Sequence, residues 1–198
     1  MITTRRELNK EKIRRSILKA SRKLFSTKGY EDTMMEDIAV TAEVSKATIY
    51  NYFPNKESLL IGTADEVLDK IKMLLDSNEH LSTSSLEKIR LVLKELVISS
   101  SEYLELSRRI TYLNSCEGSP MYKTRQEMVN IFKSLVLSAQ EEGDLKNTVS
   151  VDDIVDGIMG IYLIALFEWP HLDRIPQPFL LEKLNRTFDE MLFFYFQK

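Results

Sequence analysis

Apolar residues recur along most of this chain at the spacing of an α-helix. Near the N-terminus, Ile13, Ile17, Ala20 and Leu24 follow one another at steps of four, three and four residues, which places them on one face of a helix. Further stripes of this kind follow downstream, and no strand-like alternation of useful length separates them. The pattern predicts an all-α fold of about nine helices.

Composition agrees with a helical core. Of the 198 residues, 43% are hydrophobic, whereas only 6 are glycine and 5 are proline, the two residues that break helices. The single cysteine, Cys116, cannot form an internal disulfide, and the N-terminal segment lacks the apolar stretch of a signal peptide. The longest apolar run, residues 158–167, is shorter than the roughly 20 residues of a membrane-spanning helix. We therefore expect a cytoplasmic protein with no membrane partner.

Positive charge is concentrated in the first third of the chain. Residues 1–60 contain 12 Lys and Arg against 8 Asp and Glu, whereas the remainder contains 15 against 22. A local positive field attracts a polyanion even when the whole chain is acidic. Runs of charge also commonly mark a solvated helix face, so this pattern only indicates where a phosphate-binding surface would lie.

Capping signals divide the N-terminal segment into short helices. Gly29 is placed to end the first helix in a left-handed conformation, with Tyr30 folding back onto its last turn. Thr33 and Glu36 have the spacing of a capping box, which predicts a second short helix starting at Met34.

A third helix is expected to start after Ser45, which can cap it, and to run to about Phe53. Pro54 blocks its continuation. Asn55 can cap a fourth helix that keeps its apolar spacing to about Asp76.

The rest of the chain predicts five further helices after a polar loop over residues 78–85. Their expected first turns lie near Ser84, Leu104, Pro120, Ser150 and Pro178, and Gly143 and Pro170 end the seventh and eighth. The ninth helix carries additional aromatic residues, Phe193, Phe194 and Phe196, which exceed what one face can bury within a single chain. These aromatic residues predict a partner chain.

Two of these helices form a candidate helix-turn-helix. Residues 34–42 and 45–53 are joined by a tight turn, and the second helix is narrow enough to enter the DNA major groove. Helix pairs of this shape also occur as plain structural hairpins, so their spacing alone leaves DNA binding open.

Four ordered segments between about residues 10 and 65 form a longer pattern. They are Phe25-Ser26-Thr27-Lys28-Gly29-Tyr30, Thr33 with Ile38-Ala39, Val44-Ser45-Lys46-Ala47-Thr48-Ile49-Tyr50-Asn51-Tyr52-Phe53, and Asn55-Lys56-Glu57-Ser58-Leu59. Together these segments resemble the TetR family of transcriptional regulators. Glu43 departs from the commonest pattern, since many relatives have glycine there. The resemblance implies a DNA-binding domain over residues 1–54 and an effector-binding and dimerisation domain over residues 55–198. It also implies a repressor that a small molecule releases from its operator.

The third helix supplies the candidate DNA contacts. Its helical period places Lys46, Ala47, Tyr50 and Asn51 on one face, opposite residues 44, 49 and 53. Asn51 can hydrogen-bond to base edges, Ala47 and the methyl group of Thr48 can touch thymine methyls, and Lys46 can reach guanine or phosphate.

The resemblance adds candidate phosphate contacts beside that face. Tyr50, Tyr52 and Lys56 are expected to contact phosphate, although Tyr52 can instead pack between the short helices. Thr33 either offers a donor to phosphate or only caps its helix. Basic residues Arg5 and Arg6, expected to precede the first helix, either reach the DNA or form a solvated tail. The full set is Thr33, Ser45, Lys46, Ala47, Thr48, Tyr50, Asn51, Tyr52 and Lys56.

The resemblance also places a small-molecule pocket among helices four to seven and a homodimer interface on the last two, over residues 151–197. Gly157 and Gly160 would permit close helix approach there. Methionine and aromatic side chains suit a small apolar or aromatic effector, but each can equally be ordinary core packing. The candidates are Tyr103, Tyr112, Met128, Phe132, Met159, Tyr162 and Trp169.

Two other classes of protein were weighed. For an enzyme, His80 and His171 lack metal-spaced neighbours and Cys116 lacks an evident base, so we expect no catalysis, metal or cofactor. The alternative is a helical ligand-binding or protein-interaction module without DNA binding, against which the basic outward face of the third helix argues.

Overall fold

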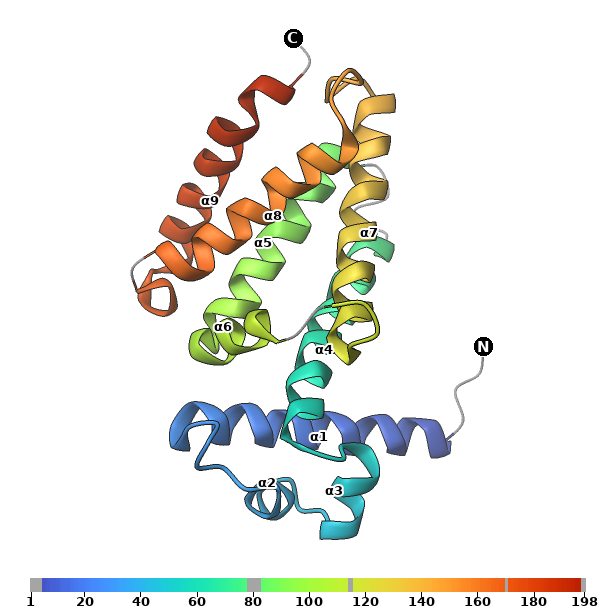
Figure 1. Cartoon of the computed structure of the whole chain (residues 1–198), viewed down its shortest axis with the longest axis vertical. Coiled ribbons are helices and arrows are strands. Elements are labelled where there is room, and N and C mark those ends of the chain that lie inside the picture. Colours follow the sequence, from blue (N-terminus) through green and yellow to red (C-terminus); the bar gives the residue numbers. More distant parts are fainter. Residues whose placement is uncertain (1–4, 78–82, 114–115, 170, 197–198) are drawn as a thin grey trace. The chain divides into compact units, whose positions relative to one another are not determined.

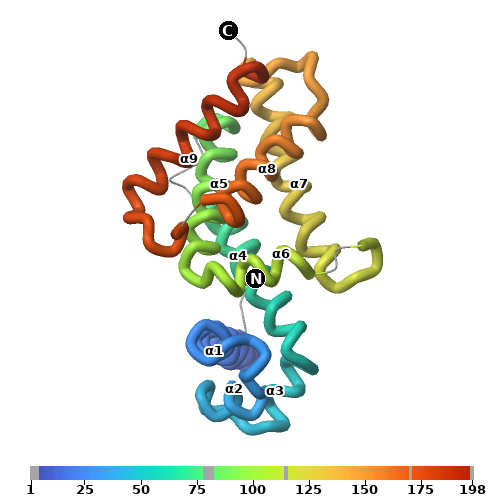
Figure 2. The backbone as a smooth tube through the Cα atoms, turned by 60° about the vertical axis from the view of Figure 1, so that its left-hand side comes forward, coloured from blue at the N-terminus to red at the C-terminus, as the bar shows by residue number. Residues whose placement is uncertain are grey.

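The computed structural model describes residues 5–77, 83–113, 116–169 and 171–196. Within these ranges the chain forms nine α-helices and no β-strand, which confirms the all-α prediction (Figures 1 and 2). The chain divides into two compact units, Met1–Asp65 and Glu66–Lys198, and the division falls within one helix. The expected domain boundary between residues 54 and 55 stays a prediction.

The first unit contains helices α1 (Arg5–Lys28), α2 (Met35–Thr41), α3 (Lys46–Tyr52) and the first turns of α4 (Lys56–Asp76). Helix α1 packs against α2, and α2 packs against α3, so that the apolar stripe of α1 is buried in the core of this unit. Members of this core that are at most 6% exposed are Ile17, Leu18, Ala20, Phe25, Ile38, Ala39, Ile49, Phe53, Leu59 and Leu60.

The end of α1 follows its sequence signal. Gly29 adopts φ of 91°, a left-handed conformation that residues with a Cβ rarely take, and it ends the helix. The ring of Tyr30 folds back so that its centroid lies 5.0 Å from that of Phe25. Arg5 and Arg6 lie in the first turn of α1, so the expectation that they precede the helix was wrong.

The predicted cap of α2 at Thr33 was also wrong. The helix begins one residue later, with Met34 at the N-cap, and the carboxylate of Asp37 accepts a hydrogen bond from the Met34 backbone N–H at 3.3 Å. The Thr33 hydroxyl instead donates to the carbonyl oxygen of Gly29 at 2.6 Å and ties the turn to the end of α1.

The two following helices have the predicted caps. Ser45 Oγ accepts from the backbone N–H of Thr48 at 3.0 Å, and Asn55 Oδ1 accepts from that of Ser58 at 2.8 Å. The turn between α2 and α3 contains Glu43 at φ of 56°, a left-handed conformation that is unfavourable for any residue with a Cβ.

Gly62 allows α4 to lie very close to the rest of the first unit. A Cβ at this position would be 2.8 Å from Cε1 of Phe53 and 3.0 Å from Cδ2 of Leu18. Real Cβ contacts are longer than this, so any larger residue would force the Phe53 ring to move.

The second unit contains the rest of α4 with α5 (Ser85–Ser101), α6 (Leu104–Tyr112), α7 (Pro120–Glu141), α8 (Val151–Glu168) and α9 (Gln177–Leu192). Helix α5 packs against α7, α8 and α9, which places it at the centre of this unit (Figures 1 and 2). Large core side chains here include Ile89, Leu93, Phe132, Val136, Ile158, Ile161, Leu184 and Phe188.

Helix ends in this unit largely match the sequence signals. Ser84 and Ser119 cap α5 and α7 through their side chains, whereas Ser150 stands at the N-cap of α8 without a side-chain bond. Gly143 follows α7 at φ of 84°. The expected loop at residues 78–82, with His80, and the helix stop at Pro170 lie outside the described residues.

The C-terminal residues are attached to the turn before α8. Lys146 donates from its backbone N–H to the carbonyl of Tyr195 at 2.8 Å and from Nζ to that of Phe194 at 2.6 Å. Phe196 packs on Phe188, with centroids 6.4 Å apart, whereas Phe193 and Phe194 are 58% and 75% exposed.

None of the helices in the described parts of the chain is sufficiently long and apolar to cross a membrane.

Candidate nucleic-acid interface

Helix α3 has one buried and one exposed face, as its sequence predicts. Ile49 is fully buried and Phe53, its C-cap, is 5% exposed. Lys46, Ala47 and Asn51 are exposed on the other face. Tyr50, on this same face, is 39% exposed. An exposed row of amide, methyl, ammonium and phenol groups on a seven-residue helix has the chemistry needed to contact base edges and phosphates.

Ser45 and Thr48 stabilise the start of α3. Besides capping through Ser45 Oγ, the two hydroxyl oxygens lie 2.8 Å apart in a mutual hydrogen bond. Thr48 is half-buried and Ser45 is exposed. Both hydroxyls therefore have a local structural role in addition to any contact with DNA.

Lys46 is held by an acidic residue of α2. Its Nζ lies 2.6 Å from Oε1 of Glu36 and 6.0 Å from the ring centroid of Tyr50. The hydrogen bond to Glu36 raises the pKa of Lys46 above its usual value, and the same bond lowers the pKa of Glu36.

Lys56 is held by backbone carbonyl groups in the turn after α1. Its Nζ donates to the carbonyl oxygens of Tyr30 at 2.8 Å and Glu31 at 3.0 Å, and it lies 4.7 Å from the Tyr30 ring centroid. The ammonium group has three donors. Lys56 therefore joins the start of α4 to this turn. It is also one of the residues expected to contact phosphate.

The first turn of α2 carries two adjacent carboxylates, Glu36 and Asp37. Asp37 Oδ2 lies 2.5 Å from Nζ of Lys28, and this bond, followed by the one from the Met34 N–H, lowers the pKa of Asp37. Sequence reasoning missed both ion pairs. The available signal was the acidic pair at the start of a helix, where negative charge is favoured.

The remaining candidates differ in exposure. Tyr52 is half-buried, which is compatible with both roles considered for it. Thr33 is 1% exposed and its hydroxyl donates to the carbonyl oxygen of Gly29. A contact of Thr33 with phosphate, through its hydroxyl or its backbone N–H, stays a prediction.

The effector candidates lie mostly in or beside the core of the second unit. Phe132 and Trp169 are buried, and Met128, Met159 and Tyr162 pack against the same core. The hydroxyl of Tyr162 lies 3.0 Å from Oγ of Ser100. Tyr103 is half-buried at the start of α6.

Tyr112 does not belong with this group. It is 78% exposed at the last residue of α6, and its ring packs edge-on against Phe167 at 5.3 Å. Tyr112 therefore lies outside the core that the other candidates share, and its role as an effector contact stays a prediction.

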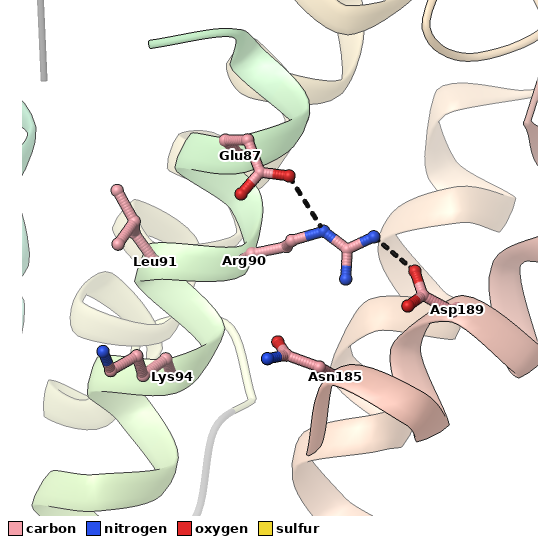
Figure 3. Close-up of a pocket in the computed structure, with 6 residues that line it drawn as sticks. All are labelled: Glu87, Arg90, Leu91, Lys94, Asn185 and Asp189. Carbon is pink, nitrogen blue, oxygen red and sulfur yellow. Dashed lines mark hydrogen bonds and ion pairs between the residues drawn. The ribbon is translucent and has the colours of Figure 1, made fainter. Parts of the chain in front are cut away.

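An open hollow of about 380 Å³ lies between α5 and α9, and none of the effector candidates lines it (Figure 3). Arg90 crosses it, with Nε 3.2 Å from Oε1 of Glu87 and with an ion pair to Asp189. Its guanidinium carbon also lies 4.3 Å from the ring centroid of Phe188. These contacts make Arg90 a cross-link between two helices. Other residues lining the hollow are Leu91, Lys94 and Asn185.

The segment that contains this helix-turn-helix matches a known family. Residues 17–62 fit the family described as "Bacterial regulatory proteins, tetR family". This N-terminal segment belongs to the TetR family. The prediction of an all-α chain with a TetR-type helix-turn-helix is thereby confirmed.

Two curated regulators extend this TetR likeness beyond the N-terminal segment. The HTH-type transcriptional regulator YuxN of Bacillus subtilis is 27% identical over 164 residues, which is 78% of this chain and 54% of YuxN. The chain thus spans about half the length of that relative. IcaR of Staphylococcus aureus, the negative transcriptional regulator of a biofilm operon, is 27% identical over 63% of this chain and 68% of its own.

A solved TetR-like structure shares the fold. The transcriptional regulator FadR from Bacillus subtilis, crystallised in complex with stearoyl-CoA, superposes with a TM-score of 0.70 over 89% of this chain and 96% of its own. The sequences are 20% identical in that comparison, so it establishes the arrangement of the helices alone.

Proposed function

We propose that this TetR-family regulator is a repressor that binds a pseudo-palindromic operator through the exposed face of α3. The observation that carries the proposal is the two-sided character of that helix, whose Lys46, Ala47 and Asn51 are exposed opposite the buried Ile49. Asn51 is expected to bind a base edge, and Ala47 to contact a thymine methyl. Tyr50 and Lys56 are expected to bind phosphate. IcaR, a negative regulator by name, supports repression.

We further propose that two copies associate through α8 and α9. Six large apolar side chains of these helices and the turn after α9 are at least 37% exposed: Leu163, Ile164, Phe179, Met191, Phe193 and Phe194. A Cβ added at Gly160 on α8 would meet nothing within 4 Å, so this position leaves room for a partner helix. A two-fold pair suits DNA, since recognition helices about 34 to 36 Å apart read successive major grooves.

The effector is proposed to be a small apolar molecule bound in the second unit near Phe132, Met128 and Tyr162. These side chains belong to or border its apolar core, and FadR, which has the same fold, was crystallised with an acyl-CoA. Helix α4 continues from the first unit into the second, so a ligand that shifts it would change the spacing of the recognition helices. Effector and operator would then weaken each other's binding by the same factor.

Selection of bound fragments from genomic DNA tests the repressor directly. The expected result is a pseudo-palindrome bound by a dimer, with the Asn51→Ala variant changing the base preference at particular positions. Acyl-CoAs and other apolar compounds are then screened for release of this operator. Recovery of no DNA, with the purified protein folded and dimeric, would exclude the repressor and favour a helical ligand-binding module. We also expect the protein in the cytoplasm, which fractionation of cells checks.

A further inference from the structure

Glu36 and Lys46 form an ion pair at the exposed surface of the helix-turn-helix. The pair joins the first turn of α2 to the first residue of α3, with Oε1 and Nζ 2.6 Å apart. Both side chains reach solvent, with exposed fractions of 41% for Glu36 and 68% for Lys46. The same Nζ lies 6.0 Å from the centroid of the Tyr50 ring.

This arrangement places a carboxylate beside groups that would meet DNA. Paired with Lys46, this carboxylate takes up the ammonium group that would otherwise add to the sequence-independent attraction between a basic surface and phosphates. It also restricts a long, flexible side chain that in solution would otherwise sample many rotamers. The pair therefore affects both where the ammonium group of Lys46 lies and how freely it can reach a phosphate.

We propose that Glu36 is a positioning residue for DNA specificity: it holds Lys46 beside Tyr50 on the reading face of α3 and restrains the lysine from binding phosphates of arbitrary sequence. The proposal rests on the proposed function, because it requires that α3 contacts DNA.

Non-specific and specific binding depend on Lys46 in different ways. Non-specific binding comes from phosphate neutralisation with release of counterions, so a lysine that must leave Glu36 first contributes less to it. Contacts to base edges need a side chain already held in the right place, because ordering it during binding costs conformational entropy. The ion pair consequently lowers affinity for arbitrary DNA more than affinity for the operator.

The variant Glu36→Gln tests this with two labelled duplexes, one of mixed sequence and one carrying the operator selected by the unaltered protein. Binding is measured over a series of salt concentrations. We expect affinity for the mixed-sequence duplex to rise about two- to fivefold, the size of one exposed ion pair. The slope of log K against log salt should steepen by up to about one unit, and the ratio of operator to mixed-sequence affinity should fall.

A matched control is Glu127→Gln on α7. Glu127 also lies 2.6 Å from a lysine, Lys72, and is similarly exposed at 35%, but its pair lies in the second unit. The substitution changes the net charge equally and should leave both duplexes bound as before. Thermal unfolding followed by circular dichroism confirms that each variant is folded.

A double-mutant cycle shows whether Glu36 acts through Lys46. In a Lys46→Gln background, Glu36→Gln should no longer change affinity or salt dependence. An equal effect in both backgrounds would overturn the proposal, because the carboxylate would then act on phosphates directly. Unchanged mixed-sequence affinity in the single variant would also overturn it while leaving the repressor intact. Failure of the unaltered protein to bind either duplex would remove both the repressor and this role of Glu36.

Discussion

The ammonium group of Lys56 donates to the carbonyl oxygen of Tyr30 at 2.8 Å, across 26 residues of sequence. This bond and the one to Glu31 fasten the start of α4 to the turn that follows α1. The family resemblance predicts that Lys56 contacts the phosphate backbone of DNA. Its two bonds to carbonyl groups indicate that it also stabilises the first unit.

We predict that Lys56→Ala lowers both stability and DNA affinity. Loss of the two carbonyl bonds at this half-buried group should reduce the free energy of unfolding by about 1 kcal/mol, measured by chemical denaturation. Loss of one phosphate contact should weaken binding about equally for all sequences and flatten the salt dependence by about one unit of slope. Lys70→Ala, on the same helix but in the second unit, should leave the salt dependence unchanged. Unchanged salt dependence in Lys56→Ala would leave the lysine with its structural role alone.

Glycine in place of Glu43 should stabilise the helix-turn-helix. Glu43 has φ of 56°, which costs a residue with a Cβ roughly 1 kcal/mol that glycine does not incur. The greater freedom of glycine in the unfolded chain offsets part of this gain, so we expect a net stabilisation of about 0.5 kcal/mol for Glu43→Gly. The β-branched substitution Glu43→Val should destabilise the protein instead. Thermal melts of the two variants should move in opposite directions, and a lower melting temperature for glycine would contradict the argument.

Glu142 makes stability depend on pH. At the end of α7 its carboxylate accepts bonds from the Ser85 hydroxyl at 2.6 Å and from the Ser85 backbone N–H at 2.8 Å, and these bonds lower its pKa. Because the folded-state pKa lies below the unfolded value, the stabilisation is fully present above the unfolded value and is lost as pH falls through the folded one.

We therefore expect Glu142→Gln to lower the free energy of unfolding by about 0.5–1 kcal/mol near pH 7. The effect is no larger because the carboxylate is exposed to solvent. The difference from the unaltered protein should vanish once the pH falls below the folded-state pKa of Glu142, which lies below the usual value for a glutamate. Denaturation at a series of pH values measures it, with Glu141→Gln as the neighbouring control. A difference that stays constant with pH would show that the Ser85 contact does not depend on the charge.

An acidic substitution on α8 should dissociate the proposed dimer. Leu163 is 42% exposed, and Leu163→Glu would place an unpaired carboxylate within the interface, a change that costs several kcal/mol when the charge is desolvated. We expect the dissociation constant from sedimentation to rise about 100-fold or more, with a parallel loss of operator binding. Leu137→Glu on α7, 50% exposed, is the matched control and should remain dimeric. If Leu163→Glu also remains dimeric, α8 is not at the interface.

Helix ends in this chain could be predicted where their signals are local. Ser45, Asn55 and Ser84 each bond to a backbone group three residues away, so spacing alone revealed them. The predicted cap at Thr33 was wrong because the hydroxyl of Thr33 donates to the carbonyl oxygen of Gly29, in the turn after α1. The start of α2 is then stabilised by Asp37 rather than Glu36.

The candidate site could be predicted only in outline. Helical period placed Lys46, Ala47 and Asn51 on the exposed face of α3, because that depends on one helix alone. The partners of Lys46 and Lys56 lie on other elements, and their contacts exist only once the helices have packed.

The same limit applies to the effector candidates. Composition could not distinguish the exposed Tyr112 from the buried Phe132, since both are aromatic residues at helical spacing.

The missing side chain at Gly62 has a consequence for how the regulator can move. The first turns of α4 lie directly against the ring of Phe53, the C-cap residue of α3, whose backbone N–H donates to the carbonyl oxygen of Ile49. With no compressible group between them, any tilt or slide of this part of α4 carries Phe53 along, and the adjoining end of α3 follows. If an effector releases the proposed operator, we therefore expect α3 to move together with the start of α4.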